Sequence, residues 1–219
     1  MKGIIFDMDG TMVDNMMVHH RAWQKKLADL GLEMTLDDVM EKIHGINEEI
    51  IANLFGDRYT PEERRQIAWE KEEAYRDIYK PELRLIDGLE SFLGEVRKRQ
   101  IPMGVGSAAP PENVDFVLDN LGIRSWFGSV KHSKDVKRGK PDPEIYHAVA
   151  AELGLQVQDC LIFEDSPVGA EAAARAGSPL VVVLTTHKQE EFSHLTNVIR
   201  FIKDFTMLTL EDLPAQSTI

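Results

Sequence analysis

Two aspartates directly follow the first apolar run of the chain, at a spacing that could place both side chains in one site. Residues 4–11 read IIFDMDGT and contain Asp7 and Asp9. Alternate side chains of a strand point the same way, so these two would face one site at the strand's end. Two neighbouring carboxylates repel each other and favour a cation between them. A lone Asp-x-Asp is more often a turn or a solvated strand end, so its meaning depends on the other motifs.

A second pair of carboxylates follows another apolar run. Glu164 and Asp165 come directly after Leu161, Ile162 and Phe163. Oxygen ligands from two separate strands are what Mg²⁺ takes, usually together with substrate phosphate and water. The two acidic pairs therefore predict a Mg²⁺ site in which the cation offsets the repulsion between carboxylates.

Two further residues have the chemistry to bind phosphate. Ser107 ends the apolar run 102–106, where its hydroxyl and the following backbone N–H groups could donate to phosphate oxygens. Lys140 stands just before Pro141-Asp142-Pro143, near an expected helix N-terminus, where free N–H groups and the helix dipole favour phosphate. Alone, each would be read as a turn residue or a surface lysine. Together with the carboxylates they predict a site for a phosphorylated ligand.

The elements that must position these residues alternate between strand and helix. Apolar runs of strand length occupy residues 2–6, 102–106, 160–163 and 180–184. Helical segments lie between them: Asp142 is expected as an N-cap with Pro143 in the first helical position, and the same grammar spans 166–177. This alternation predicts an α/β fold with a doubly wound parallel sheet. Its binding crevice would lie beyond the carboxyl ends of the strands.

One region breaks the alternation. Between residues 15 and 85 every periodic segment is helical, and no strand is evident. We therefore expect a core domain of residues 1–14 and 86–219, interrupted by a helical insertion of residues 15–85. The last residues, 214–219, read as a frayed tail.

Composition limits the classes of partner. The formal net charge of −12 argues against non-specific nucleic-acid binding and against an anionic membrane surface. No apolar run approaches the roughly 20 residues that cross a bilayer, so we expect a cytoplasmic protein, monomeric by default. The one cysteine, Cys160, lies in an apolar run and is expected to be a buried structural thiol.

Taken in order, the Asp pair, Ser107, Lys140 and the Glu-Asp pair resemble the four sequence motifs of the haloacid dehalogenase superfamily. The helical insertion is similar to the cap of the β-phosphoglucomutase-like branch. His19 to Trp23 resembles the His-x-x-Ala-Trp element of that cap, which makes His19 and Trp23 candidate substrate or cap residues, and Lys71 is a further match. For His19, a packed position in the cap and a substrate contact both stay open.

The resemblance implies a mechanism and a set of ligands. Asp7 would attack phosphorus and form an aspartyl-phosphate, while Asp9 would first give and later take a proton. Ser107 and Lys140 would hold the transferring phosphoryl group. The implied Mg²⁺ ligands are Asp7, the backbone carbonyl of Asp9, Asp165 and, close by or through water, Glu164.

The same machinery serves a phosphatase or a mutase, depending on whether water or a sugar hydroxyl accepts the phosphoryl group. In β-phosphoglucomutases a Gly-x-x-Arg element of the cap binds the distal phosphate. Here the stretch from Gly45 ends in Glu48, an anion that would repel a second phosphate. The Lys-Asn pair that follows the serine in those mutases is also missing, since residues 108–111 read AAPP. We therefore expect a phosphatase for a small phosphorylated metabolite such as a sugar phosphate.

Two alternatives stay open. The first is a β-phosphoglucomutase, which would interconvert β-glucose 1-phosphate and glucose 6-phosphate. The second is a non-catalytic regulator that binds a phosphorylated ligand, although such a relative would be expected to have lost Asp7, Asp9 or the acidic pair. A response-regulator-like receiver does not explain the helical insertion.

Overall fold

The computed structural model describes residues 1–213 and divides into two compact units. One unit, here called the core, comprises Met1–Asp14 together with the chain from Arg84 onward. The other unit, the cap, comprises Asn15–Leu83. The tail expected at residues 214–219 lies outside the described residues.

Strands and α-helices alternate along the core, whereas the described part of the cap contains helices and no strand. In chain order they are β1 (Gly3–Phe6), α1 (Met16–Asp29), α2 (Leu36–Lys42), α3 (Asn47–Phe55), α4 (Pro61–Tyr79), α5 (Leu89–Lys98), β2 (Met103–Gly106), α6 (Pro111–Asn120), β3 (Ser129–Lys131), α7 (Glu144–Glu152), β4 (Cys160–Glu164), α8 (Pro167–Ala176), β5 (Leu180–Val183) and β6 (Val198–Ile202). Short 3₁₀ turns connect several of these elements.

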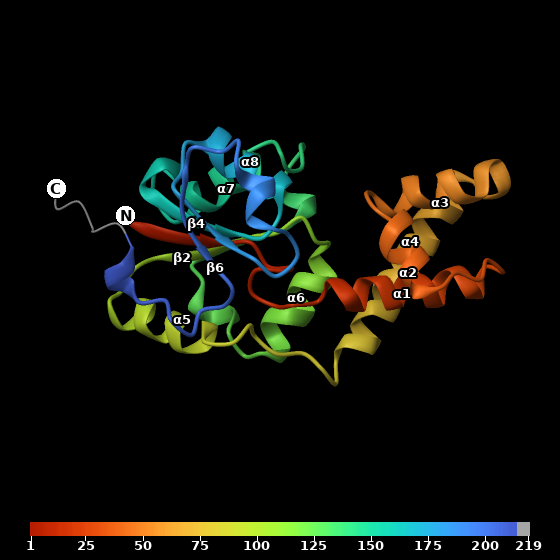
Figure 1. Ribbon diagram of the computed structural model, residues 1–219, viewed down its shortest axis with the longest axis horizontal. Coiled ribbons are helices and arrows are strands. Elements are labelled where there is room, and N and C mark those ends of the chain that lie inside the picture. Colours follow the sequence, from red (N-terminus) through yellow and green to blue (C-terminus); the bar gives the residue numbers. More distant parts are fainter. Residues whose placement is uncertain (214–219) are drawn as a thin grey trace. The chain divides into compact units, whose positions relative to one another are not determined.

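The strands form one parallel sheet in the order β3-β2-β1-β4-β5-β6. The chain therefore winds outward from β1 in one direction, then returns and winds outward in the other. Figure 1 shows α7 and α8 on one face of this sheet and α5 and α6 on the other. The expected α/β fold with a doubly wound parallel sheet and an inserted helical cap is confirmed. The change of winding direction falls between β1 and β4, where such sheets bind their ligands.

Two strands were missed in the sequence, β3 and β6. Both lie at the edges of the sheet. Edge strands are short or polar and lack the continuous apolar run of a central strand. β3 has only three residues, and β6 is partly exposed and carries Arg200 in its middle. Neither therefore gave the apolar signal that identified the four central strands.

The predicted start was correct for α8, whereas α7 begins one residue later than predicted. Ser166 caps α8 by accepting the N–H of Gly169, and Gly177 ends it in the left-handed conformation. The assignment of Asp142 as the N-cap of α7 was wrong, because Pro143 holds that position and the helix begins at Glu144. The Asp142 carboxylate instead accepts the Glu144 N–H, in a turn that precedes the helix.

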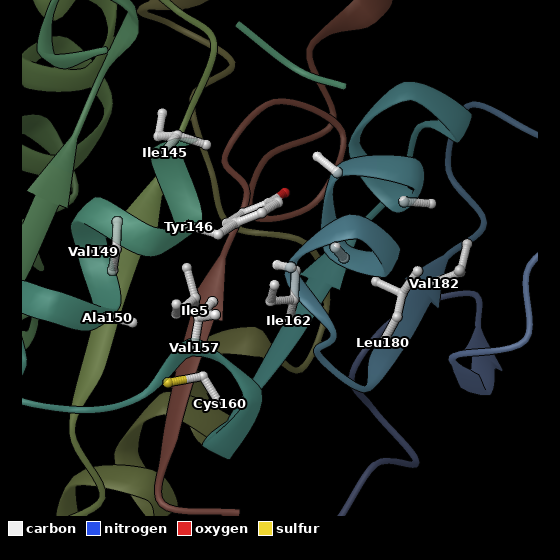
Figure 2. Packing of buried hydrophobic residues seen from close by; sticks show 14 of the residues in the cluster. Ile5, Ile145, Tyr146, Val149, Ala150, Val157, Cys160, Ile162, Leu180 and Val182 are labelled. Atoms are coloured by element: carbon white, nitrogen blue, oxygen red, sulfur yellow. The ribbon is translucent and has the colours of Figure 1, made fainter. Parts of the chain in front are cut away.

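Apolar side chains from α7, α8 and the central strands form a buried cluster on one face of the sheet. Figure 2 shows Tyr146 and Val149 of α7 packed against Ile5 of β1 and Ile162 of β4. A methyl group on Gly104 of β2 would lie 2.3 Å from Val149 Cγ1, so glycine is needed for the close approach of α7 to the sheet. Cys160 is fully buried in this cluster, and its pKa is raised to about 11 by burial, as expected for a structural thiol.

The cap has its own hydrophobic core. Trp23, Leu27, Val39 and Ile51 are buried together there, on helices α1, α2 and α3. α4 begins with a complete capping box, in which Thr60 and Glu63 satisfy each other's backbone N–H groups. In the part of the chain that the structure describes, no helix is long and apolar enough to cross a membrane.

Candidate active site

Three neighbouring strands deliver the candidate residues to one edge of the sheet. β1 pairs with β2 on one side and with β4 on the other. Asp7 directly follows β1, and its N–H donates to the Phe163 carbonyl at 2.9 Å. Phe6 and Phe163 are paired in register, so Asp7 and Glu164 come next along their strands. Parallel register alone therefore brings residues 157 positions apart in sequence to the same edge.

Asp7, Glu164 and Asp165 form a buried acidic cluster. Each offers a carboxylate oxygen, and these oxygens lie within 4.8 Å of one another. Lys140 extends its ammonium into the cluster and donates to Asp7 Oδ1 at 2.5 Å and to Glu164 Oε1 at 2.7 Å. The side chains of Lys140, Asp7 and Glu164 are 7%, 8% and 1% exposed, so water screens these charges poorly.

The electrostatics of this cluster are those of an unbalanced buried site. Burial raises the pKa of Asp7 well above its usual value; Lys140 opposes the shift, and the neighbouring carboxylates add to it. The pKa of Asp165 is raised to about 8, first by burial and then by the charge of Glu164. Burial also opposes ionisation of Glu164, but Lys140 and several hydrogen bonds lower its pKa overall. One ammonium thus keeps Glu164 ionised and leaves the other two carboxylates short of positive charge.

Asp9 and Ser107 lie at the same edge. The charge of Asp9 raises the pKa of both Asp7 and Asp165, which places it close to them. Asp9 is not one of the residues whose oxygens form the compact cluster. Ser107 follows β2 and is fully buried, and its Oγ accepts the Ala109 N–H at 3.0 Å. Its hydroxyl hydrogen therefore remains available to donate.

Small residues that sequence reasoning did not single out support the cluster. A Cβ on Gly10 would lie 2.1 Å from Asp165 Oδ2, and one on Gly169 would lie 1.6 Å from Glu164 Oε1. The two glycines therefore make room for the acidic side chains. Thr186, which follows β5, donates to Asp165 Oδ2 at 2.5 Å. Glycine and threonine are too common for their positions in the sequence to have signalled this role.

Within the cap, three of the four candidate residues lie together. The Lys71 ammonium donates to His19 Nδ1 at 2.8 Å and lies 5.6 Å from the ring centroid of Trp23. His19 also stacks on Tyr75, with ring centroids 3.9 Å apart. Burial, and then the charge of Lys71, lower the pKa of His19 to about 3, so the imidazole is neutral near pH 7. Glu48, in the first turn of α3, makes no hydrogen bond or ion pair within the described residues.

Two residues of the acidic cluster, Asp7 and Asp165, fit a divalent cation. Mg²⁺ prefers carboxylate and carbonyl oxygens, and Asp7 and Asp165 offer carboxylates from two strands. Burial and the neighbouring carboxylates raise the pKa of both groups, and a bound cation would oppose these shifts. No thiol or imidazole is part of the compact cluster, so softer metals such as zinc are disfavoured.

This charge balance predicts a pH-dependent effect of Mg²⁺ on stability. The folded pKa of Asp165 is about 8, above the usual 3.8 that applies after unfolding, so without a cation the fold loses stability as pH rises between those values. Mg²⁺ bound to Asp165 would displace its proton, so we expect Mg²⁺ to raise the melting temperature by at least about 3 °C more at pH 8.5 than at pH 5.5. Thermal melts with and without Mg²⁺ measure this difference. Equal stabilisation at both pH values would contradict it, and NaCl of matched ionic strength is the control.

The fold and the site define an α/β enzyme with an acidic, lysine-paired site at the carboxyl ends of its parallel strands. The chain belongs to the haloacid dehalogenase-like hydrolases, since the model of that family matches residues 1–177. The resemblance found in the motifs is thereby confirmed.

Individual relatives extend this similarity. The chain is 31% identical over 185 residues to fructose-1-phosphate phosphatase of Escherichia coli K12, covering 83% of this chain and 95% of that protein. It is 30% identical to β-phosphoglucomutase of Bacillus subtilis, covering 81% and 80% of the two chains. A chloroplastic 5-amino-6-(5-phospho-D-ribitylamino)uracil phosphatase of Arabidopsis thaliana is 28% identical over 96% of this chain, which spans only 57% of that protein.

Solved structures support the fold. The crystal structure of a family IA, variant 3 haloacid dehalogenase hydrolase from Entamoeba histolytica superposes with a TM-score of 0.87 over 97% of each chain. Its sequence is 23% identical to this one, so this similarity concerns the fold alone.

Proposed function

We propose that the protein is a Mg²⁺-dependent phosphatase that hydrolyses a small phosphorylated metabolite, such as a sugar phosphate, through an aspartyl-phosphate on Asp7. The observation that carries this proposal is the buried contact of Lys140 with Asp7, beside the carboxylate of Asp165. Residues suited to act as nucleophile, phosphate-binding cation and metal ligand thus lie together at one edge of the sheet. The phosphatases among the relatives add support.

In the first half-reaction, a carboxylate oxygen of Asp7 attacks phosphorus and the bond from phosphorus to the ester oxygen breaks. Asp9 gives its proton to the departing alkoxide. In the second half-reaction, water attacks the phosphorus of the acyl phosphate and gives its proton to Asp9, and Asp7 returns to a carboxylate as inorganic phosphate leaves. Lys140 and the Ser107 hydroxyl stabilise the charge on the equatorial oxygens.

Asp7, the backbone carbonyl of Asp9 and Asp165 would hold Mg²⁺, with Glu164 close by or acting through water. The cation would neutralise the charge of the phosphoryl group and of the carboxylates. Asp7 can then stay ionised, which a nucleophile requires. We propose that His19, Trp23, Glu48 and Lys71, all in the cap, take part in choosing the substrate, and that the catalytic core and the cap divide functionally at residues 15 and 85.

β-Phosphoglucomutase activity is the second candidate, because a mutase is among the relatives. Glu48 argues against it, since it places an anion where those mutases use an arginine. We expect β-glucose 1-phosphate and other sugar phosphates to release inorganic phosphate at least about tenfold faster than any mutase product forms. A phosphate-release assay and a coupled assay for glucose 6-phosphate, run on the same enzyme, measure the two rates.

The reverse ratio, with glucose 6-phosphate appearing much faster than inorganic phosphate, would overturn the phosphatase assignment in favour of the mutase. A broad panel of phosphomonoesters that releases no phosphate with Mg²⁺ would instead revive a non-catalytic, ligand-binding role. Adding a glucose bisphosphate primer to the coupled assay controls for a mutase that needs priming. Boiled enzyme controls for spontaneous hydrolysis.

A further inference from the structure

The Glu164 carboxylate is saturated with hydrogen-bond donors. Oε1 accepts from Lys140 Nζ at 2.7 Å and from the Tyr146 hydroxyl at 2.9 Å. Oε2 accepts the N–H of Asp165 at 2.9 Å, and both the N–H and the hydroxyl of Ser166 at 3.0 Å. A carboxylate has about four lone-pair positions, and these donors already occupy them. Glu164 therefore has no oxygen lone pair left for a direct bond to a metal.

The Tyr146 hydroxyl donates to Glu164 but takes no part in the two proposed half-reactions. Its ring is fully buried in the apolar cluster between α7 and the sheet. Figure 2 shows the ring extending from α7 above Ile5 and Ile162, with the hydroxyl oxygen at the end away from the helix. A phenylalanine would fill the same apolar space without bringing a polar atom into it. The hydroxyl is therefore present for its bond to Glu164, since an unpaired buried hydroxyl would be destabilising.

The ring of Tyr146 also contacts the Lys140 ammonium. Lys140 Nζ is 5.0 Å from the ring centroid, within the range of a cation–π contact. Tyr146 thus contacts both members of the Lys140–Glu164 pair, one through its ring and the other through its hydroxyl. The ammonium is fixed by Glu164 on one side and reaches Asp7 on the other.

We infer that Tyr146 is a positioning residue for the phosphate-binding lysine. Its hydroxyl holds Glu164 Oε1 against Lys140, so that Glu164 orients the lysine and is not a direct ligand of the metal. The inference rests on the proposed function for its meaning, but the contacts themselves belong to the core alone. Glu164 and Tyr146 would then affect the binding of phosphate, through Lys140, and not the binding of the metal. Asp165, whose Oδ2 accepts a hydrogen bond from Thr186, would instead be a direct ligand of the metal.

The test compares Tyr146→Phe with Val149→Ala by calorimetry. Tyr146→Phe removes one oxygen and changes no charge. Val149 lies one turn further along α7 in the same buried cluster and has no polar atom, so Val149→Ala is a matched control for lost packing. The measured quantities are the dissociation constant of Mg²⁺ alone and that of inorganic phosphate at saturating Mg²⁺. Both are repeated in a Lys140→Met background.

We expect Tyr146→Phe to weaken phosphate binding about five- to tenfold while the Mg²⁺ dissociation constant changes less than about twofold. In the Lys140→Met background the same substitution should have no further effect on phosphate, because the two residues act as one unit. Val149→Ala should lower the melting temperature and leave both constants unchanged. Ser166→Ala, which removes a hydroxyl donor from the other oxygen of Glu164, should weaken phosphate binding in the same direction and provides a second variant.

Unchanged phosphate binding in Tyr146→Phe would overturn the inference, as would an equal loss in the Lys140→Met background. If Tyr146→Phe lowered Mg²⁺ affinity as much as phosphate affinity, Glu164 would be a direct ligand of the metal after all. A wild-type protein that hydrolyses no phosphomonoester would contradict the proposed function. The two binding constants would still decide the role of Tyr146, so the two failures can be told apart.

Discussion

Replacement of Asp7 by asparagine is expected to reduce phosphate release by about 10⁴-fold or more, as when other enzymes lose their nucleophile. Asparagine has nearly the same shape, but its amide is a poor nucleophile and cannot form an acyl phosphate. The substitution also leaves Lys140 with Glu164 as its one remaining buried carboxylate contact. Steady-state phosphate release measures the loss, and mass spectrometry of rapidly quenched wild-type enzyme should find the phosphoryl group on Asp7.

A matched control is Asp159→Asn. Asp159 directly precedes β4 and pairs with Lys2, and its side chain is 39% exposed. That substitution also removes one carboxylate, but at the opposite end of the strands, so activity should stay within about twofold of wild type. Retained turnover in Asp7→Asn, with the protein folded and free of deamidated product, would disprove the covalent mechanism.

The arrangement of the principal site residues followed from the sequence because parallel strands impose it. Asp7, Ser107 and Glu164 each come at or just past the end of a buried apolar strand. In a parallel sheet all such ends meet at one edge, so spacing along the chain does not matter once the strands are recognised. Lys140 lies on no strand, and it was grouped with the others by its place before an expected helix N-terminus and by its resemblance to a motif. The structure gives it two buried carboxylate contacts.

The supporting contacts could not be predicted, since they depend on packing between elements distant in sequence. Thr186 meets Asp165 only because β5 lies beside β4. Tyr146 reaches Glu164 only because α7 packs closely against the sheet, which the glycine at position 104 allows. Apolar periodicity can indicate that a helix such as α7 has a buried face, but it cannot distinguish a tyrosine that packs from one that donates a hydrogen bond.

The cap illustrates the same limit. His19 and Lys71 were identified separately, 52 positions apart, and the packing of α1 on α4 brings them into a hydrogen bond. The Lys71 ammonium also pairs with the Glu72 carboxylate at 2.9 Å, and these two contacts satisfy the buried lysine on α4. Within the cap, His19 thus packs on Tyr75 and is bonded by Lys71. A role in substrate choice remains our proposal.

Replacement of Asp165 by asparagine is expected to weaken Mg²⁺ binding and phosphate release, each by about 10³-fold. Asp165 is buried, and burial followed by the charge of Glu164 raises its pKa to about 8, so a bound cation would favour its ionised form. An amide oxygen keeps the shape and the bond from Thr186 but removes the charge that attracts the cation. Calorimetric titration with Mg²⁺ and steady-state turnover measure the two losses. Chelation of the metal in wild-type enzyme should have an equally large effect on turnover, reversed by added Mg²⁺.

A graded control separates the charge of Asp165 from its orientation. Thr186→Val keeps the carboxylate and removes only the hydroxyl that donates to Oδ2, so Mg²⁺ affinity should fall about tenfold, as is typical when a supporting hydrogen bond to a metal ligand is lost. If Asp165→Asn and Thr186→Val lowered affinity equally, the charge of Asp165 would not be what binds the cation. Full turnover after complete chelation would contradict metal dependence itself. Phosphoryl transfer would then rest on Lys140, the one cation bonded to Asp7 among residues 1–213, and the raised pKa of Asp7 would make it a poor nucleophile near neutral pH.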